Sequence, residues 1–127
     1  MPDTVRQYRI AVIDDDAGFA MSMAALLGSD GFDVRLFDSA ESFIAADETP
    51  RFRCLLVDWL LPGMSGATLC ERVAALDRPP ALILMSGTQF VDDRLPRQLA
   101  PDVEFVQKPF DPEWLLDELA TICNRPQ

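Results

Sequence analysis

Five polar side chains follow or end apolar segments of this sequence, and their types suit the chemistry of phosphate. Two carboxylates follow the first segment, one follows the third, a hydroxyl follows the fourth and an amine follows the fifth; these are Asp14, Asp15, Asp58, Ser86 and Lys108. Each alone has an ordinary structural explanation, since aspartates cap helices and most lysines are solvated. Their shared position at the ends of four segments is what indicates a site.

The charge of these groups predicts which ligand they would bind. Two unit charges about 4 Å apart repel by about 4 kcal/mol at an effective dielectric near 20, so three ionised carboxylates in contact would cost on the order of 10 kcal/mol. Lys108 alone does not offset that cost, whereas Mg²⁺ is typically held by one or two carboxylates with waters and phosphate oxygens. The residues therefore favour a magnesium site where one carboxylate attacks a phosphoryl group while Lys108 and Ser86 hold its oxygens.

The apolar segments that position these groups alternate with helix-like sequence. We expect strands at residues 9–13, 33–37, 54–57, 81–85 and 103–106, and helices at 17–27, after 38, at 66–76 and after 111. This alternation predicts an α/β fold, a doubly wound five-stranded parallel sheet with helices on both faces. Ligands of such sheets bind outside the carboxyl ends of the strands, where the five polar residues stand.

Capping residues set the expected ends of the helices. The expected N-terminal caps are Asp16, Asp38 with Glu41 as a capping box, and Asp111 ahead of Pro112. Gly28 or Gly31 is expected to end the first helix. The segment 88–100 is expected to form only a short or broken helix, because Pro96 removes a hydrogen bond within it.

Composition limits the class of protein. The length of 127 residues predicts one domain, residues 1–127 with a core at about 8–124, and the net charge of −10 disfavours direct binding to nucleic acid. The three cysteines, Cys54, Cys70 and Cys123, are odd in number and widely spaced, and the chain has no histidine that could bind a metal with them. They are therefore expected to be reduced and mostly buried. No apolar run is long enough to cross a membrane and no export signal is evident, so we expect a cytoplasmic protein.

Four motifs in this order and spacing resemble the receiver domain of two-component response regulators, of the CheY-like and FixJ-like kind. They are Ile13-Asp14-Asp15-Asp16, Val57-Asp58-Trp59-Leu60-Leu61-Pro62-Gly63-Met64-Ser65-Gly66, Met85-Ser86-Gly87 and Gln107-Lys108-Pro109-Phe110. The resemblance covers essentially the whole chain. It implies the flavodoxin-like, CheY-like fold with strand order 2-1-3-4-5.

The resemblance also implies a role for each carboxylate. Asp58 would be the phosphoacceptor, and Asp15 and Asp58 would bind Mg²⁺ together with the main-chain carbonyl of Leu60. Asp14 would act on the metal through water, and Asp16 would cap the helix.

Three further positions match the family's switch. Ser86 would sense the phosphoryl group, Lys108 would pair with its oxygens, and the Lys108–Pro109 peptide would be cis. Phe105 occupies the position of the switch aromatic, although it could equally be a core residue.

The implied function is that of a regulator that catalyses only its own phosphorylation and dephosphorylation, and not of an enzyme with other substrates. Its implied partners are a histidine kinase or a histidine phosphotransfer protein, with a possible phosphorylation-dependent homodimer and neither nucleic acid nor membrane. Two residues depart from the common pattern. Pro96 puts the usual output face in doubt, and Leu60 could hinder the attacking water or simply make a packing contact.

Other functions are weighed against this one. A degenerate receiver that acts by constitutive contact would be expected to lack a site residue, and none is lacking. A flavin-binding electron carrier needs a hydroxyl-rich or glycine-rich phosphate loop, where Asp14, Asp15 and Asp16 would repel the cofactor. An aspartyl phosphatase usually needs a second aspartate two residues after the nucleophile, where this chain has Leu60.

Overall fold

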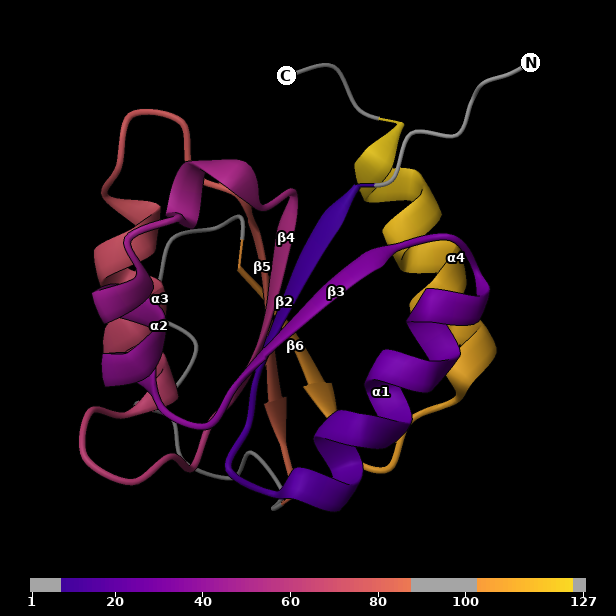
Figure 1. The fold of residues 1–127 in the computed structure, drawn as a ribbon, viewed down its shortest axis with the longest axis horizontal. Coiled ribbons are helices and arrows are strands. Elements are labelled where there is room, and N and C mark those ends of the chain that lie inside the picture. The colour runs from indigo at the N-terminus through magenta and orange to yellow at the C-terminus, as the bar shows by residue number, and fades with distance from the viewer. Residues whose placement is uncertain (1–7, 88–102, 125–127) are drawn as a thin grey trace.

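The computed structural model describes residues 8–87 and 103–124 of the chain. Strands and helices alternate along these residues (Figure 1). In chain order they are β2 (Arg9–Ile13), α1 (Ala17–Ser29), β3 (Asp33–Phe37), α2 (Ala40–Ala46), the 3₁₀ turn η1 (Thr49–Arg51), β4 (Cys54–Asp58), α3 (Gly66–Ala74), β5 (Ala81–Ser86), β6 (Val103–Gln107) and α4 (Pro112–Cys123).

The strands form a parallel five-stranded sheet in the order β3-β2-β4-β5-β6, which confirms the predicted order 2-1-3-4-5. Each strand lies within one residue of its predicted bounds. The register pairs Ile13 with Phe37 and Val57, and Asp58 with Met85. The residues that follow the strands therefore meet at one edge, beside the place where the strand order reverses between β2 and β4.

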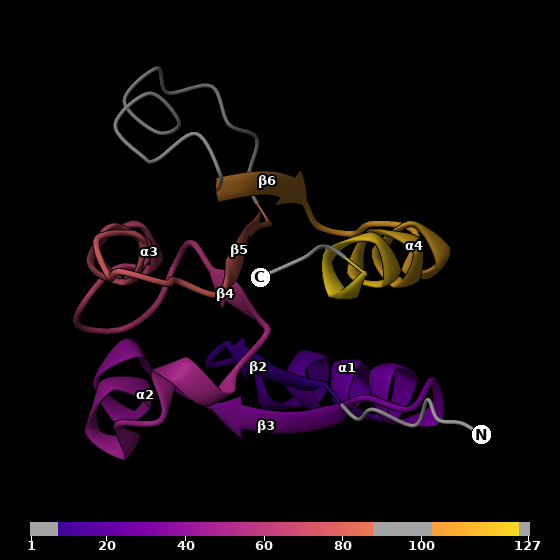
Figure 2. The same ribbon diagram turned by 90° about the horizontal axis from the view of Figure 1, so that it is seen from above.

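Helices cover both faces of the sheet. Figure 2 shows α1 and α4 on one face and α2 and α3 on the other. Alternate residues of each strand point to opposite faces, so Ile10 and Val12 belong to the core beside α1 and α4, whereas Ala11 and Ile13 belong to the core beside α2 and α3. All five residues of β4 are buried, as expected for a central strand of a sheet covered on two faces.

Two of the predicted helix caps are confirmed. The Asp16 carboxylate accepts a hydrogen bond from the Phe19 main-chain N–H at 3.2 Å, and α1 begins at Ala17. The Asp111 carboxylate accepts from the main-chain N–H of Glu113 at 2.9 Å, and α4 begins at Pro112.

The predicted capping box of α2 is wrong by one residue. Ser39 is the N-cap, and its Oγ accepts from the Ser42 main-chain N–H at 3.0 Å. Asp38 instead accepts from the Ser42 hydroxyl at 3.2 Å. The Glu41 carboxylate accepts a hydrogen bond from the main-chain N–H of Met64, so it makes a tertiary contact rather than the predicted contact within the helix cap.

The remaining expectations on the fold have different outcomes. Helix α3 ends at Ala74 rather than Leu76, and α1 ends at Ser29, two residues before Gly31, whose φ is +96°. The three cysteines are free and buried, as predicted. None of the described helices is long and apolar enough to span a bilayer. The helix expected near Pro96, at 88–100, lies outside the described residues.

Candidate functional site

The carboxyl edge of the sheet holds three buried polar residues. Asp14 follows β2, Asp58 ends β4 and Ser86 ends β5; their exposed fractions are 2%, 8% and 1%. They are the polar and charged residues found buried within the described part of the chain. Because burial of an ionised group without a partner is costly, the two buried carboxylates at this edge need a positive charge beside them.

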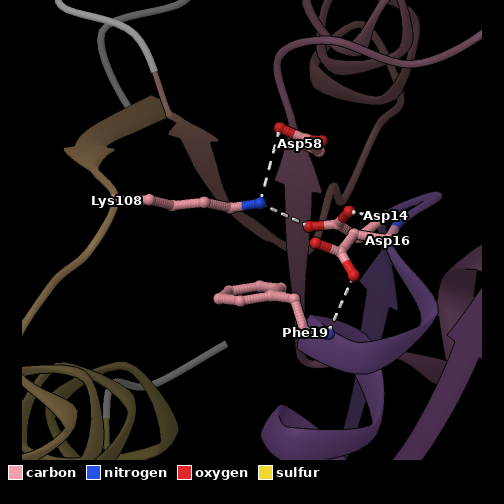
Figure 3. A network of polar contacts seen from close by, with 5 residues as sticks. All are labelled: Asp14, Asp16, Phe19, Asp58 and Lys108. Atoms are coloured by element: carbon pink, nitrogen blue, oxygen red, sulfur yellow. Dashed lines mark hydrogen bonds and ion pairs between the residues drawn. The ribbon is translucent and has the colours of Figure 1, made fainter.

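Lys108 supplies the positive charge at this edge. Its Nζ lies 2.7 Å from Oδ2 of Asp14 and 3.8 Å from Oδ1 of Asp58, and its side chain extends between the two carboxylates (Figure 3). Its main-chain N–H donates to the Ser86 carbonyl at 2.6 Å, which extends the pairing of β5 and β6 by one residue. The Lys108–Pro109 peptide bond is cis, as expected.

A third carboxylate completes the cluster. Oxygens of Asp14, Asp15 and Asp58 lie within 4.8 Å of one another, and Asp15 is exposed whereas the other two are buried. Burial and the charge of Asp14 raise the pKa of Asp58 from 3.8 to about 6, while Lys108 and the main-chain N–H of Leu60 act in the opposite direction. Lys108 is therefore insufficient to stabilise the ionised form of Asp58 fully.

The set of oxygen ligands fits Mg²⁺. A hard divalent cation prefers carboxylate, carbonyl and water oxygens, and it would relieve the repulsion that raises the pKa of Asp58. Asp16 lies outside this cluster, because its carboxylate caps α1.

The loop between β4 and α3 is anchored to α2. The Glu41 carboxylate accepts from the main-chain N–H of Met64 at 2.8 Å, next to Gly63, whose φ is +72°. A Cβ at residue 63 would lie 2.5 Å from Oε2 of Glu41, so the contact also needs glycine there. Sequence analysis missed this anchor, because Glu41 was assigned to a local cap.

Leu60 lies in the same loop, and the residue is 60% exposed. This exposure argues against a packing contact as the reason for an apolar residue at this position. Whether its carbonyl binds a metal stays a prediction.

Phe19, in the first turn of α1, is a further residue of the site that is not among the predicted ones. The ring lies under the ammonium of Lys108, with Nζ 4.0 Å from the ring centroid (Figure 3). This distance is typical of a cation–π contact. The helical spacing of apolar residues gave no signal of it, because the contact joins residues 89 positions apart on α1 and after β6.

Two predicted residues remain, Ser86 on β5 and Phe105 on β6. Ser86 is buried at the end of β5, next to the strand that leads to Lys108. Phe105 is half-buried on β6, where its main chain pairs with Leu84 and its side chain packs against the core beside α2 and α3. The structure thus brings together Asp14, Asp15, Asp58 and Lys108 directly, with Ser86 at the adjoining strand end.

A groove of about 510 Å³ opens beside the acidic pair. Asp14 and Asp15 line one part of it, and Met21 and Leu36 are apolar residues of its wall. The groove therefore reaches the acidic pair, whereas Asp58 and Lys108 do not line it.

Comparison with known sequences gives a consistent result. A model of the response regulator receiver domain family matches residues 10–120. The transcriptional regulatory protein FixJ of Bradyrhizobium diazoefficiens is 37% identical over 106 residues, which are 84% of this chain and 52% of that protein. The DNA-binding response regulator MtrA of Mycobacterium tuberculosis is 34% identical over 123 residues, 97% of this chain and 53% of that protein. The chain thus spans about half the length of these relatives.

Solved structures share the fold. A CheY-like response regulator receiver domain protein from Methanospirillum hungatei superposes with a TM-score of 0.80 at 26% identity, covering 91% of this chain and 92% of that one. The BeF3-activated DrrB receiver domain gives a TM-score of 0.81 at 27% identity, covering 94% and 99%. With the match of the family model over most of its length, the chain belongs to the family of response regulator receiver domains.

Proposed function

We propose that this chain is the phosphoacceptor domain of a His-Asp phosphorelay, in which Asp58 takes a phosphoryl group in a Mg²⁺-dependent reaction. The observation that carries the proposal is the cluster of Asp14, Asp15 and Asp58 with the ammonium of Lys108 between two of them. Two of these carboxylates are buried, and buried like charges destabilise a folded chain unless a cation offsets them. Such an arrangement is typical of a functional site.

The mechanism follows from the positions of these residues. An oxygen of the Asp58 carboxylate attacks phosphorus, the bond from phosphorus to the donor nitrogen breaks, and the nitrogen keeps the electron pair. Lys108, already 3.8 Å from Asp58, is close enough to pair with an oxygen of the group transferred there. Ser86, buried at the next strand end, would hold another oxygen and link the modification to the Phe105 region of β6.

Three residues would hold the metal, namely Asp15 and Asp58 directly, with the Leu60 carbonyl. The bound Mg²⁺ would supply positive charge to the phosphoryl oxygens. Both oxygens of Asp14 already accept hydrogen bonds, from Lys108 at 2.7 Å and from the Asp16 main-chain N–H at 2.9 Å. These bonds support the indirect role assigned to Asp14.

In this proposal the chain catalyses only its own phosphorylation and dephosphorylation, in the cytoplasm. The donor is a histidine kinase or a histidine phosphotransfer protein. Phosphorylation changes the conformation of the chain, and a phosphorylation-dependent homodimer is one possible result of that change. The relatives FixJ and MtrA are named as a transcriptional and a DNA-binding regulator. The net charge of −10 argues that the residues of this chain do not themselves contact DNA.

The test is phosphorylation by acetyl phosphate, followed by a panel of histidine kinases. We expect one hydroxylamine-labile phosphoryl group per chain by intact mass in the presence of Mg²⁺, and none when the metal is chelated. Labelling that is unaffected by chelation, or a label that resists hydroxylamine, would contradict an aspartyl phosphate formed with Mg²⁺.

A matched pair of substitutions tests the metal ligands. Asp15→Asn and Asp16→Asn each remove one negative charge from the same turn, but only Asp15 belongs to the oxygen cluster. We expect Asp15→Asn to weaken Mg²⁺ binding by about tenfold or more, equivalent to about 1.4 kcal/mol, because a ligand is lost. Asp16→Asn should change it far less, since asparagine still caps α1. Quenching of Trp59 fluorescence measures the affinity, and equal losses in the two variants would refute the assignment.

A further inference from the structure

We propose that Phe19 is a positioning residue for Lys108, whose ammonium the aromatic ring holds beside Asp58, where a phosphoryl oxygen would arrive. The inference rests on the proposed function and adds a residue to its machinery. The carrying observation is the ring under Nζ of Lys108, shown in Figure 3.

Three groups surround the ammonium. Nζ of Lys108 lies 2.7 Å from Asp14, 3.8 Å from Asp58 and 4.0 Å from the centroid of the Phe19 ring. The side chain of Lys108 is only 18% exposed, so these groups replace much of its water. The distance to the ring is well inside the limit of about 6 Å for attraction of a cation to an aromatic face.

The ring itself is fixed by contacts that do not involve Lys108. Phe19 lies in the first turn of α1, and its main-chain N–H donates to the Asp16 carboxylate at 3.2 Å. Its ring meets the ring of Phe110 edge to face, with centroids 6.2 Å apart and an angle of 87°. Phe110 in turn contacts Trp114 of α4, with centroids 6.2 Å apart. The ring therefore packs between α1 and the turn that carries Lys108, and these contacts fix its position beside the ammonium.

An aromatic ring is a suitable neighbour for a lysine whose ammonium has to exchange one hydrogen-bond acceptor for another. The ring face attracts the positive charge but offers no lone pair that fixes the direction of an N–H, so the donors of the ammonium can turn toward a new oxygen. A carboxylate in this place would compete with the phosphoryl group for Lys108 and add repulsion. An aliphatic side chain would leave the desolvated ammonium with weaker support on that side.

The test compares three variants of the chain. Phe19→Leu keeps apolar bulk but removes the ring, Phe19→Tyr keeps the ring, and Phe110→Leu removes a neighbouring ring that does not lie under the ammonium. With acetyl phosphate and saturating Mg²⁺, we expect Phe19→Leu to lower the labelling rate three- to tenfold, with Mg²⁺ affinity within twofold of the parent. Phe19→Tyr should stay within about twofold of the parent rate. Phe110→Leu removes one contact of the Phe19 ring but leaves that ring beside the ammonium, so it should lower the rate less than Phe19→Leu does.

Proton NMR gives a readout that does not depend on activity. The ring current of Phe19 should shift the Cε protons of Lys108 upfield in the parent and in Phe19→Tyr, and the shift should be lost in Phe19→Leu. The rate loss should also vanish when Phe19→Leu is made in a Lys108→Met background, as a double-mutant cycle requires of two residues that act through each other.

The outcomes separate the two proposals. A parent chain that is never labelled, yet shows the ring-current shift, would overturn the proposed function while leaving the Phe19–Lys108 contact intact. A Phe19→Leu variant that labels at the parent rate would overturn the positioning role, as would equal losses for Phe19→Leu and Phe110→Leu, which would indicate general packing of the aromatic cluster.

Discussion

Asp58→Asn is expected to abolish labelling by acetyl phosphate while making the Mg²⁺-free protein more stable at pH 7. The amide cannot form an acyl phosphate, so labelling should fall below detection. The gain in stability has a different cause, because burial and the charge of Asp14 make the ionised form of Asp58 unfavourable in the folded chain. Loss of labelling together with a gain in stability distinguishes a phosphoacceptor whose charge is unfavourable in the folded chain from a residue that only stabilises the fold.

The sign of the pH dependence follows from the raised pKa of Asp58. Its value is about 6 in the folded chain against 3.8 ordinarily, so between these values the folded state binds more protons than the unfolded state. The free energy of unfolding of the parent therefore falls as the pH rises through this window, and the full cost of the ionised group is present above about pH 6. Asparagine does not ionise and avoids this cost.

Urea unfolding of both proteins in a chelating buffer measures the difference. We expect it to grow between about pH 4 and pH 6 and then stay constant, at on the order of 1 to 3 kcal/mol in favour of Asp58→Asn. Added Mg²⁺ should stabilise the parent and reduce the difference, because the metal binds the ionised carboxylate. Persistent labelling of Asp58→Asn would remove Asp58 as the phosphoacceptor, and a variant less stable than the parent at pH 7 would contradict the account of its electrostatics.

The sheet and most of the site could be predicted because both depend on local sequence. A strand covered on both faces needs an almost unbroken apolar run, as in β4, and parallel strands bring their carboxyl ends to one edge. A polar residue directly after such a run, such as Asp14 or Asp58, can therefore be assigned to the edge without coordinates. The strand order, which the resemblance to receiver domains implies, then brings these residues close to one another.

What could not be predicted depends on contacts between distant segments. Asp38 and Ser39 are adjacent residues that both cap helices well, and only the path of the chain selects Ser39. Glu41 has a local role available to it, but the main chain of Met64 lies within its reach and binds it instead. Phe19 has the spacing of any core residue, and its position under the ammonium depends on where α1 meets the turn after β6.

Gly66 is a further residue that a tertiary contact explains, since the sequence predicts it only as the first residue of the helix expected at 66–76. It is the first residue of α3, and its main-chain N–H donates to the Trp59 carbonyl at 3.3 Å. A Cβ there would overlap the main-chain oxygen of Asp58 and lie 2.9 Å from its carbonyl carbon and 3.1 Å from Cγ1 of Val57. Two of these atoms are main chain, so they cannot yield by a change of rotamer.

Gly66→Ala is therefore expected to be strongly disruptive. Either α3 moves away from the end of β4, or the main chain of Asp58 moves with its carboxylate. We expect a loss of about 2 to 4 kcal/mol in the free energy of unfolding, at or above the usual range for overpacking. Labelling by acetyl phosphate should fall by about tenfold or more even where the protein is fully folded, since a displacement of about 1 Å can cost about a hundredfold in rate.

Gly28→Ala is the matched control, because the chemical change is the same and the position is also helical. A Cβ at residue 28 meets nothing within 4 Å. Alanine there should leave labelling unchanged and stabilise the protein by up to about 1 kcal/mol, since glycine is the poorer helix former. The two variants differ only in what surrounds the added methyl group. If Gly66→Ala kept both the stability and the labelling rate of Gly28→Ala, then the close packing of α3 against Asp58 would not be what holds the phosphoacceptor in place.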